Sequence, residues 1–210
     1  MTPQGTRPRV EGEREAEIFD ATARLLVECG YDKLTFDAVA AAARASKATL
    51  YRRWPSKADL VIDLLEHLKG VGLQPLVDSG NLREDLLALS CGEGGLAGEM
   101  PLGIIGALIP ALHRDDELTA AFQRRFIAPK LQVAVAAFER ARARGEVGAD
   151  ADTDLLARIL PSMCTHEVFV LGTHLTRERI AHLIDTVVLP ACRATVTPPS
   201  DRPSTVGPAR

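Results

Sequence analysis

The chain has 210 residues, with 25 Lys and Arg against 28 Asp and Glu, and its formal net charge is −3. This near-neutral balance excludes a protein coated with basic residues for nucleic-acid binding, so any such contact must come from a local basic patch. Hydrophobic residues make up 46% of the chain and aromatic residues only 4%. Ala and Leu dominate, and because both lose little conformational freedom in a helix, the composition favours helices over sheets.

The sequence predicts a soluble, cytoplasmic protein that does not bind membranes. Residues 1–14 lack the apolar segment of a signal peptide. The longest apolar run, 102–112, is far shorter than the ~20 residues that span a bilayer. Four widely spaced cysteines show no C-x-x-C pair, which is typical of small buried side chains in a reducing compartment: Cys29, Cys91, Cys164 and Cys192.

The N-terminal third is predicted to contain a flexible arm over residues 1–12 and four helices between residues 13 and 70. The apolar positions of the first helix follow the spacing of an amphipathic helix. We expect the fourth helix, 56–70, to link this domain to the remainder of the chain. A segment rich in Gly and Pro, 72–80, follows this helix and marks the boundary. Residues suited to begin or end helices separate the four segments: Gly30, Thr35, Ser46, Pro55 and Ser56.

Five further helices are predicted over a second domain, 81–192. Their approximate bounds are 81–90, 102–113, 115–144, 153–171 and 176–192. Pro129 is expected to kink the third of these helices, because proline lacks an amide hydrogen. The Pro- and Ser-rich tail 193–210 is predicted to be disordered. No segment has the pattern of a strand, so the predicted fold is all-α with about nine helices.

Residues 35–61 are predicted to form two short helices joined by a tight turn, followed by the start of a third. Between residues 38 and 58 this segment contains no carboxylate but five cations: Arg44, Lys47, Arg52, Arg53 and Lys57. Such a helix suits a DNA groove, because positive charge attracts phosphates and long donors reach base edges. Alternatively, a short basic helix is a solvated surface, and a helix-turn-helix shape also occurs in proteins that do not bind DNA.

The helix over residues 46–54 is predicted to turn one face to the core and the other to DNA. Leu50 and Trp54 lie four residues apart, so they share the core face. The opposite face carries Lys47, Ala48, Tyr51 and Arg52. In a helix-turn-helix this face enters the major groove, where the two long cations can donate to guanine. The small alanine allows close approach, and the tyrosine hydroxyl can reach a phosphate.

Two helix starts are predicted to bind phosphate. Lys57 lies in the first turn of a helix, where the positive end of the helix dipole makes a cation unfavourable. A phosphate at this helix start would explain the lysine, since backbone amides and the side chain would bind it together. Thr35 begins another helix and could bind phosphate in the same way.

The stretch from residue 13 to about residue 68, about a quarter of the chain, resembles the DNA-binding domain of the TetR family of transcriptional repressors. The family pattern is a Thr at a helix start, an Ile-Ala pair, and then A-G-V-S-x-G-T-L-Y-x-x-F-x-S-K-x-x-L. The matching residues here are Thr35, Val39, Ala40, Ala43, Ser46, Thr49, Leu50, Tyr51, Trp54, Ser56, Lys57 and Leu60.

Two positions depart from the family pattern. Arg44 stands where the family usually has the glycine of the turn, and Ala48 stands at a second common glycine position. We expect Arg44 to be compatible with the fold, and either to adjust the turn or to add a phosphate contact. Ala48 is expected to affect one base contact and to leave the fold intact.

The resemblance implies a homodimer that binds a double-stranded DNA operator, with the last two helices of each chain forming a four-helix bundle. The segments 153–171 and 176–192 each carry an apolar stripe that is compatible with this bundle. Two such helices at the chain end, together with the two-fold symmetry of a palindromic operator, favour a dimer. In a monomer the same stripes would face the core.

The resemblance also implies a pocket for a small-molecule effector among the middle helices. Candidate lining residues are Leu86, Met100, Ile105, Ile109, Phe122, Phe126, Phe138, Met163, Cys164, His166, Glu167 and Val170. Most of these side chains would serve equally well as ordinary core. His166 and Glu167 are the best polar candidates, although a histidine hydrogen-bonded to a backbone carbonyl is the commoner arrangement.

The motifs typical of enzymes are incomplete or absent in this sequence. The spacing Gly92-x-Gly94-x-x-Ala97 fits a dinucleotide fingerprint, but no strand precedes it. His166-Glu167 would begin a zinc-protease motif, yet Val170 occupies the position of the second histidine. The sequence has no G-x-S-x-G elbow, phosphate loop or credible metal cluster. We therefore predict no catalysis, no cofactor and no bound metal.

These observations predict a ligand-responsive transcriptional repressor whose dimer places two basic helices in successive major grooves of a palindrome. An effector in the C-terminal core would shift the helix 56–70, change the spacing of the two helices and weaken DNA binding. One alternative is an activator, or a regulator without an effector, built on the same DNA-binding domain. Another, of a different class, is an all-α ligand-binding or enzymatic module with no role at DNA.

Overall fold

A computed structural model of the chain describes residues 11–68, 78–92, 96 and 102–193. These residues form helices and no strand, so the predicted all-α fold is confirmed. The helices are α1 (Glu11–Lys33), α2 (Phe36–Ala42), α3 (Lys47–Arg53), α4 (Lys57–Leu68), α5 (Leu82–Cys91), α6 (Leu102–Leu112), α7 (Asp116–Ala121), η1 (Phe122–Ile127), α8 (Ala128–Ala143), α9 (Thr153–Phe169), α10 (Arg177–Leu183), η2 (Ile184–Val188) and α11 (Leu189–Arg193).

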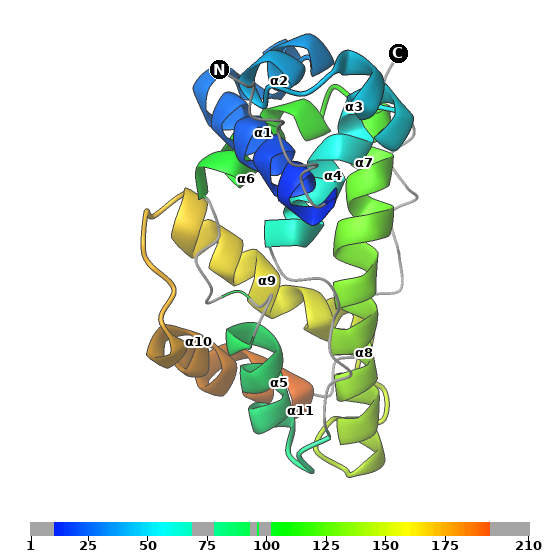
Figure 1. Cartoon of the computed structure of the whole chain (residues 1–210). Helices are drawn as coiled ribbons and strands as arrows, with labels where there is room; N and C mark the ends of the chain where they lie inside the picture. Colours follow the sequence, from blue (N-terminus) through cyan, green and yellow to red (C-terminus); the bar gives the residue numbers. More distant parts are fainter. Residues whose placement is uncertain (1–10, 69–77, 93–95, 97–101, 194–210) are drawn as a thin grey trace, which may run out of the picture.

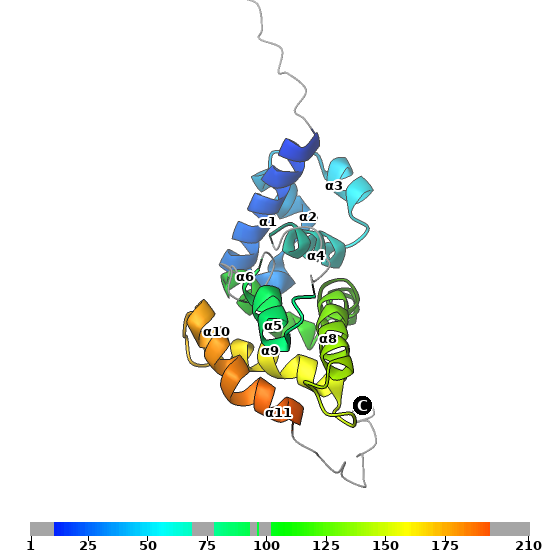
Figure 2. The same ribbon diagram turned by 90° about the horizontal axis from the view of Figure 1, so that it is seen from below.

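The described part of the chain contains nine helices, as predicted, because the π-helical turns η1 and η2 each join two α-helices. Within α1 the backbone leaves the helical region at Gly30, the residue expected to end this helix, whose φ is 77°. Helices α1 to α4 gather at one end of the molecule together with α6 and α7 (Figure 1). The helix α8 runs from there to the opposite end, where α5, α10 and α11 lie. The second view, from below, likewise places α3 far from α10 and α11 (Figure 2). The predicted arm and tail lie almost wholly outside the described residues.

Side-chain caps begin the short helices where the sequence predicts them. Thr35 Oγ1 accepts a hydrogen bond from the Ala38 amide at 3.2 Å, and Ser46 Oγ accepts one from the Thr49 amide at 3.1 Å. Ser56 Oγ caps α4 in the same way. A cap satisfies an amide that the first turn of a helix leaves without a partner, and each is worth ~1 kcal/mol. These three caps therefore position α2, α3 and α4 from local sequence alone.

The turn between α2 and α3 contains the one residue other than glycine with positive φ in the described chain. Arg44 has φ 51°. A side chain in this left-handed region crowds the following carbonyl oxygen, which costs about 1–2 kcal/mol unless the residue is glycine. The turn geometry is thus retained with arginine in place of glycine, at an energetic cost.

The described residues form two hydrophobic cores. The first combines α1 to α4 with buried side chains of later helices, among them Ile104 and Leu108 of α6 and Phe126 of η1. The second contains α5, α8, α9 and the final helix, with Phe138 and Leu160 among its buried residues. The first core thus extends well past the break at 72–80. The proposed domain boundaries at 70 and 81 remain a prediction.

Pro129 lies just after a π-helical turn, and the kink predicted at this proline remains a prediction. The π-helical turn η1 immediately precedes α8, and Pro129 occupies its first turn. Because proline has no amide hydrogen and its ring crowds the preceding turn, the backbone before it widens from α to π. The result is one long helix, α7–η1–α8, that belongs to both cores.

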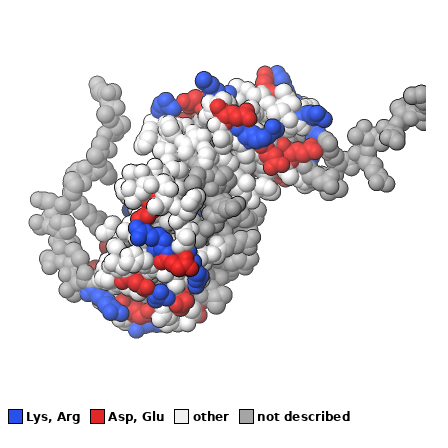
Figure 3. Space-filling view, turned by 90° about the vertical axis from the view of Figure 1, so that its left-hand side faces the viewer, with Lys and Arg blue, Asp and Glu red and all other residues white. Residues whose placement is uncertain are grey.

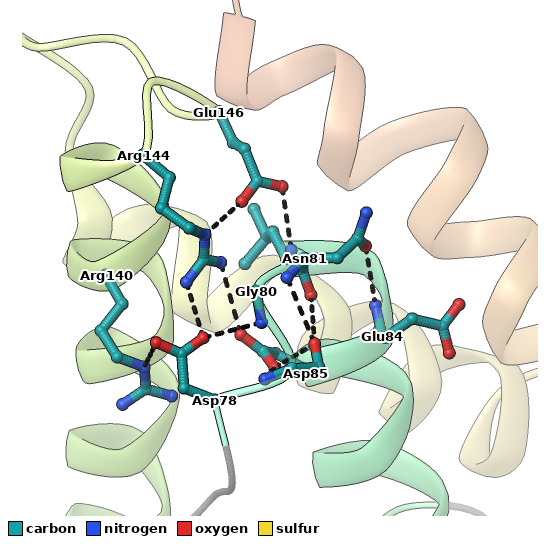
Figure 4. A network of polar contacts seen from close by, with 10 residues as sticks. Asp78, Gly80, Asn81, Glu84, Asp85, Arg140, Arg144 and Glu146 are labelled. Carbon is teal, nitrogen blue, oxygen red and sulfur yellow. Dashed lines mark hydrogen bonds and ion pairs between the residues drawn. The ribbon is translucent and has the colours of Figure 1, made fainter.

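A polar network attaches the start of α5 to the end of α8 (Figure 4). The carboxylate of Asp85 is completely buried and accepts hydrogen bonds from Ser79, at 2.8 Å from the amide and 2.6 Å from the hydroxyl. Arg144 lies 3.5 Å from this carboxylate and also contacts Asp78 at 2.7 Å and Glu146 at 2.6 Å. Glu146 in turn accepts from the amide of Leu82. These contacts hold the chain in place where it enters α5.

Replacing Arg44 with Gly should stabilise the protein by about 0.5–1 kcal/mol, because relief of the left-handed strain exceeds the entropy that glycine adds to the unfolded chain. Ala48→Gly, the other departure from the family pattern, should have the opposite sign and cost up to about 1 kcal/mol, because it lies in a helix. Urea denaturation of both variants measures the difference. Destabilisation by Arg44→Gly would contradict the strain.

Asp85→Ala should lower the free energy of unfolding by about 2–4 kcal/mol, since Ser79 and Arg144 would lose a buried partner. The exposed neighbour Glu84 provides the control, and Glu84→Ala should change stability by less than about 0.5 kcal/mol. Equal effects of the two substitutions in urea denaturation would show that the network does not contribute.

Candidate nucleic-acid interface

Helix α3 presents the two faces that its sequence predicts. Leu50 is fully buried and Trp54, its C-cap, is 2% exposed. Tyr51, in contrast, is 59% exposed, and the other residues of the predicted DNA face are also exposed. The helix therefore lies on the outside of the molecule with a basic, aromatic face turned to solvent.

Helix α2 supports this face from one side. Phe36, at the start of α2, packs edge-on against Tyr51, with 4.8 Å between the ring centroids and an interplanar angle of 82°. Edge-to-face packing of this kind contributes about 0.5–1.5 kcal/mol beyond the area it buries. The ring of Tyr51 is thereby held against α2 although much of it faces solvent.

Two cations of the predicted patch have acidic partners that the local sequence did not reveal. Lys47 Nζ lies 2.6 Å from Asp37 in α2, and Arg53 lies 3.0 Å from Glu15 in α1. Figure 3 shows basic and acidic side chains intermixed at the end of the molecule that holds these helices. Exposed ion pairs are worth only about 0–1 kcal/mol, so a phosphate can replace such a carboxylate at little cost.

Arg44 and Arg52 differ from their neighbours, since neither guanidinium has an ion-pair partner among the described residues. A further cation, Arg14 of α1, lies at the turn, where it donates to the carbonyl oxygen of Arg44 at 2.7 Å. Only the folded chain brings Arg14 to this site, because 30 residues separate it from Arg44 in the sequence. The patch is therefore built from three helices and the α2–α3 turn.

The position of Lys57 at the start of α4 has an explanation within the chain. Its Nζ donates to the carbonyl oxygen of Tyr31 at 2.9 Å and lies 4.0 Å from the centre of that ring. Burial, and then the charge of Asp115, raise the pKa of Tyr31, so the phenol is neutral at physiological pH. A phosphate contact by Lys57 remains a prediction, as does one at Thr35, which is exposed and caps α2.

The residues predicted to line an effector pocket are distributed over two separate cores. Phe126 is part of the first core, with Ile105 and Phe122 packed against it. Leu86, Phe138 and Cys164 belong to the second, with Met163 beside them. Ile109 is partly buried, whereas His166 and Val170 are exposed, and Met100 lies outside the described residues. Their role in binding an effector remains a prediction.

Glu167 is buried with partners of its own. Its carboxylate pairs with Arg179 of α10 and accepts from the Thr173 hydroxyl at 2.9 Å. The hydrogen bond from Arg179, and then that from Thr173, lower the pKa of Glu167, so the ion pair stabilises the fold at neutral pH and is lost as the pH falls. The carboxylate of Glu167 therefore has a structural role, because its ion pair connects α9 to α10.

A surface groove lies along α8 and the start of α9, with a volume of about 390 Å³. It is lined mainly by apolar side chains: Ala128, Leu131, Gln132, Val135, Ala136 and Asp154. None of these residues belongs to the predicted effector set. Within the described residues, no three His, Cys, Asp or Glu side chains are arranged to hold a metal ion. No described helix has the length and apolar character needed to cross a membrane.

Comparison with known proteins places this geometry in a family. Residues 18–64 match the family model "Bacterial regulatory proteins, tetR family", and residues 76–187 match "Tetracyclin repressor-like, C-terminal domain". A helix-turn-helix-type transcriptional regulator of Mycobacterium bovis is 38% identical over 190 residues, covering 89% of this chain and 91% of the relative. The DNA-binding transcriptional repressor TetR of Mycobacteroides abscessus is 35% identical, covering 84% of this chain and 92% of the relative.

A solved structure of the flavonoid-responsive regulator FrrA is 25% identical and superposes with a TM-score of 0.57, covering 83% of this chain and 92% of that one. The curated relatives are transcriptional regulators, and the helix-turn-helix match contains the whole of α2 and α3. The match to the C-terminal model extends over more than half of the chain, from before α5 into η2. The chain therefore belongs to the TetR family of DNA-binding transcriptional regulators.

Proposed function

We propose that the protein is a repressor that binds a palindromic operator as a homodimer and is released by a small-molecule effector. The observation that supports this most directly is the outward face of α3, where Tyr51 and Arg52 are exposed while Leu50 and Trp54 are buried. A helix held in this way can enter the major groove without disturbing its own core. The curated relative from Mycobacteroides abscessus is described as a repressor, which favours repression.

The proposed DNA contacts are of two kinds: contacts to phosphates, which position α3 on the duplex, and contacts to base edges, which recognise the sequence. Arg44, in the turn before α3, and Arg53, the last residue of α3, would bind phosphates. Further phosphate ligands at the helix starts would be Ser46, Thr49, Thr35 and Lys57. Arg52 and Lys47 would donate to guanine, and Ala48 would lie against the bases. Lys47 would exchange its Asp37 partner for DNA.

The dimer is proposed to form through the last two helices, α9 and α10–η2–α11. Leu155 of α9 and Val170, the C-cap of that helix, are large apolar side chains that remain exposed in the single chain. Two copies related by a two-fold axis would cover such surfaces and place their α3 helices roughly 34 Å apart, the spacing of successive major grooves. A monomer offers no such match to a palindrome.

The effector is proposed to be small and largely apolar, because apolar residues dominate the candidate set. The similar regulator FrrA is described as flavonoid-responsive, which supports a response to a small molecule here. Leu86, Met100, Ile105, Ile109, Phe122, Phe126, Met163, His166, Glu167 and Val170 remain the proposed contacts. An effector would act by favouring the state that does not bind DNA by a few kcal/mol.

A gel-retardation experiment with the DNA upstream of the chain's own coding region tests the proposal. We expect retardation of one discrete complex, abolished by Tyr51→Ala combined with Arg52→Ala on the exposed face. Absence of retardation even at low salt would favour a ligand-binding module without a DNA role. A reporter gene behind the same DNA then separates repression from activation, because increased transcription would eliminate the repressor.

Arg52→Ala should relax sequence preference at one base pair by about 1–3 kcal/mol, because a bidentate contact to a base edge is lost. Binding to a set of single-base operator variants measures this. The neighbouring Arg53→Ala provides the control and should weaken all the variants alike. An equal loss on every operator with Arg52→Ala would contradict base reading.

Asp37→Asn should strengthen DNA binding severalfold, because it frees Lys47 and removes a negative charge beside the phosphates. The matched control is Glu84→Gln, which removes an exposed acid that is also ion-paired, at the start of α5. Fluorescence anisotropy of labelled operator at fixed salt gives both affinities. Weaker binding by Asp37→Asn would contradict this prediction and would indicate that the Asp37 carboxylate itself accepts a hydrogen bond that DNA binding requires.

A further inference from the structure

The side chain of Arg125 connects the long helix α7–η1–α8 to the DNA-binding end of the molecule. It lies in the π-helical turn η1, and its guanidinium contacts three carboxylates of α4. The contact to Glu66 is 2.8 Å and that to Asp59 is 3.4 Å, with Asp63 bound between them. These acids lie at positions i, i+4 and i+7, so they share one face of α4.

The three carboxylates would repel one another without this cation. Like charges one turn apart destabilise a helix, and one guanidinium can bind several of them because its donors form a rigid planar fork. The side chain of Arg125 is only 30% exposed, as is that of Asp59 at 31%, while that of Asp63 is still less so at 20%. The cluster is thus partly shielded from water, and its ion pairs are stronger than those at the open surface.

Asp63 carries the contact on to the recognition helix. While one of its oxygens binds Arg125, the other accepts a hydrogen bond from Trp54 Nε1 at 2.8 Å. Trp54 is the C-cap of α3 and is buried. A single carboxylate therefore joins η1 of the C-terminal half to the end of α3.

Asp59 makes a second link at the same junction. Its amide donates to Ser56 Oγ, the cap of α4, and the Ser56 hydroxyl lies 3.0 Å from its carboxylate. Arg125 thus contacts both acids of α4 that are hydrogen-bonded to the connection between α3 and α4, Asp63 through Trp54 and Asp59 through Ser56. A movement of η1 would reach this connection through two charged contacts.

We propose that Arg125 is a positioning residue for DNA binding: through Asp63 and Trp54 it sets the orientation of α3, although it lies outside the helix-turn-helix and touches no DNA. The inference rests on the proposed role of the α3 face. Its location in η1 matters, because a return to α-helical register would rotate the side chain by about 100° away from α4. Any ligand that changed this turn would release α4 and α3 together.

The test compares Arg125→Met with Arg124→Met, which removes an exposed cation from the same turn. The duplex is one selected from a random-sequence library by the wild-type chain. Arg125→Met should lower operator affinity about tenfold, and Arg124→Met should leave it unchanged. The slope of log affinity against log salt should stay the same for both, whereas loss of a phosphate contact would reduce it by about 0.9.

Fluorescence gives a readout that does not depend on DNA. Trp54 is the only tryptophan of the chain, so its emission reports this link directly. The emission of the free protein should shift to longer wavelength in Arg125→Met and stay unchanged in Arg124→Met. A purely structural role would lower the free energy of unfolding while the folded variant kept its affinity and emission.

Equal operator affinity of the wild type and the folded Arg125→Met overturns the inference, and so does a salt slope reduced by about 0.9. Should Arg125→Met fail to fold, Arg125→Lys replaces it, because lysine keeps the charge but cannot bridge three carboxylates. It should show a smaller loss in the same direction, and unchanged affinity would again overturn the inference. Failure of the wild type itself to bind any duplex would instead refute the proposed function.

Discussion

The buried indole of Trp54 is the contact on which the DNA-facing surface depends. The centroid of its ring lies 5.9 Å from that of the Phe19 ring, and its N–H donates a hydrogen bond to the carboxylate of Asp63. A buried indole needs such a partner, because an unsatisfied donor in the core would cost about 1–3 kcal/mol. With Leu50 buried one turn earlier, α3 cannot rotate without exposing both residues to water. The outward direction of Tyr51 and Arg52 is a consequence of this anchoring.

The basic surface is balanced by acids from neighbouring helices. Asp37 and Glu15 restrain Lys47 and Arg53 in the free chain, and Arg44 and Arg52 have no such partner in the described structure. An exposed ion pair holds a long side chain in place but is easily exchanged for a phosphate. The near-neutral chain therefore retains a surface that suits DNA, and its affinity is expected to fall steeply with salt.

The two halves of the chain are joined by packing as well as by charge. Buried residues of α6 and η1 complete the core that α1 to α4 begin, and α8 continues the same helix into the second core. Such a continuous helix transmits displacement better than a loop, since its backbone hydrogen bonds resist bending. The Asp85 network then fixes the start of α5 to the far end of that helix. The helix α7–η1–α8 therefore packs in both cores and is joined to α5 at its far end.

Local residue patterns were enough to predict the helical class, the starts of α2, α3 and α4, the buried and exposed faces of α3, and the family. These features depend on contacts within a few residues, such as the caps at Thr35 and Ser46 and the spacing of Leu50 and Trp54. The sequence also predicted that Arg44, which replaces the usual glycine of the family, lies in the turn. Its positive φ is seen only in the structure.

The partners of the charged residues could not be predicted from the sequence and are known from the folded chain. Lys57 binds the carbonyl of Tyr31, and Arg125 binds three acids 59 to 66 residues away in the chain. The folded chain also places the predicted effector residues in two separate cores. Apolar periodicity predicts that a side chain is buried, but it does not predict which other residues that side chain packs against. Pairings across long loops depend on how helices pack in space, and no local pattern records that packing.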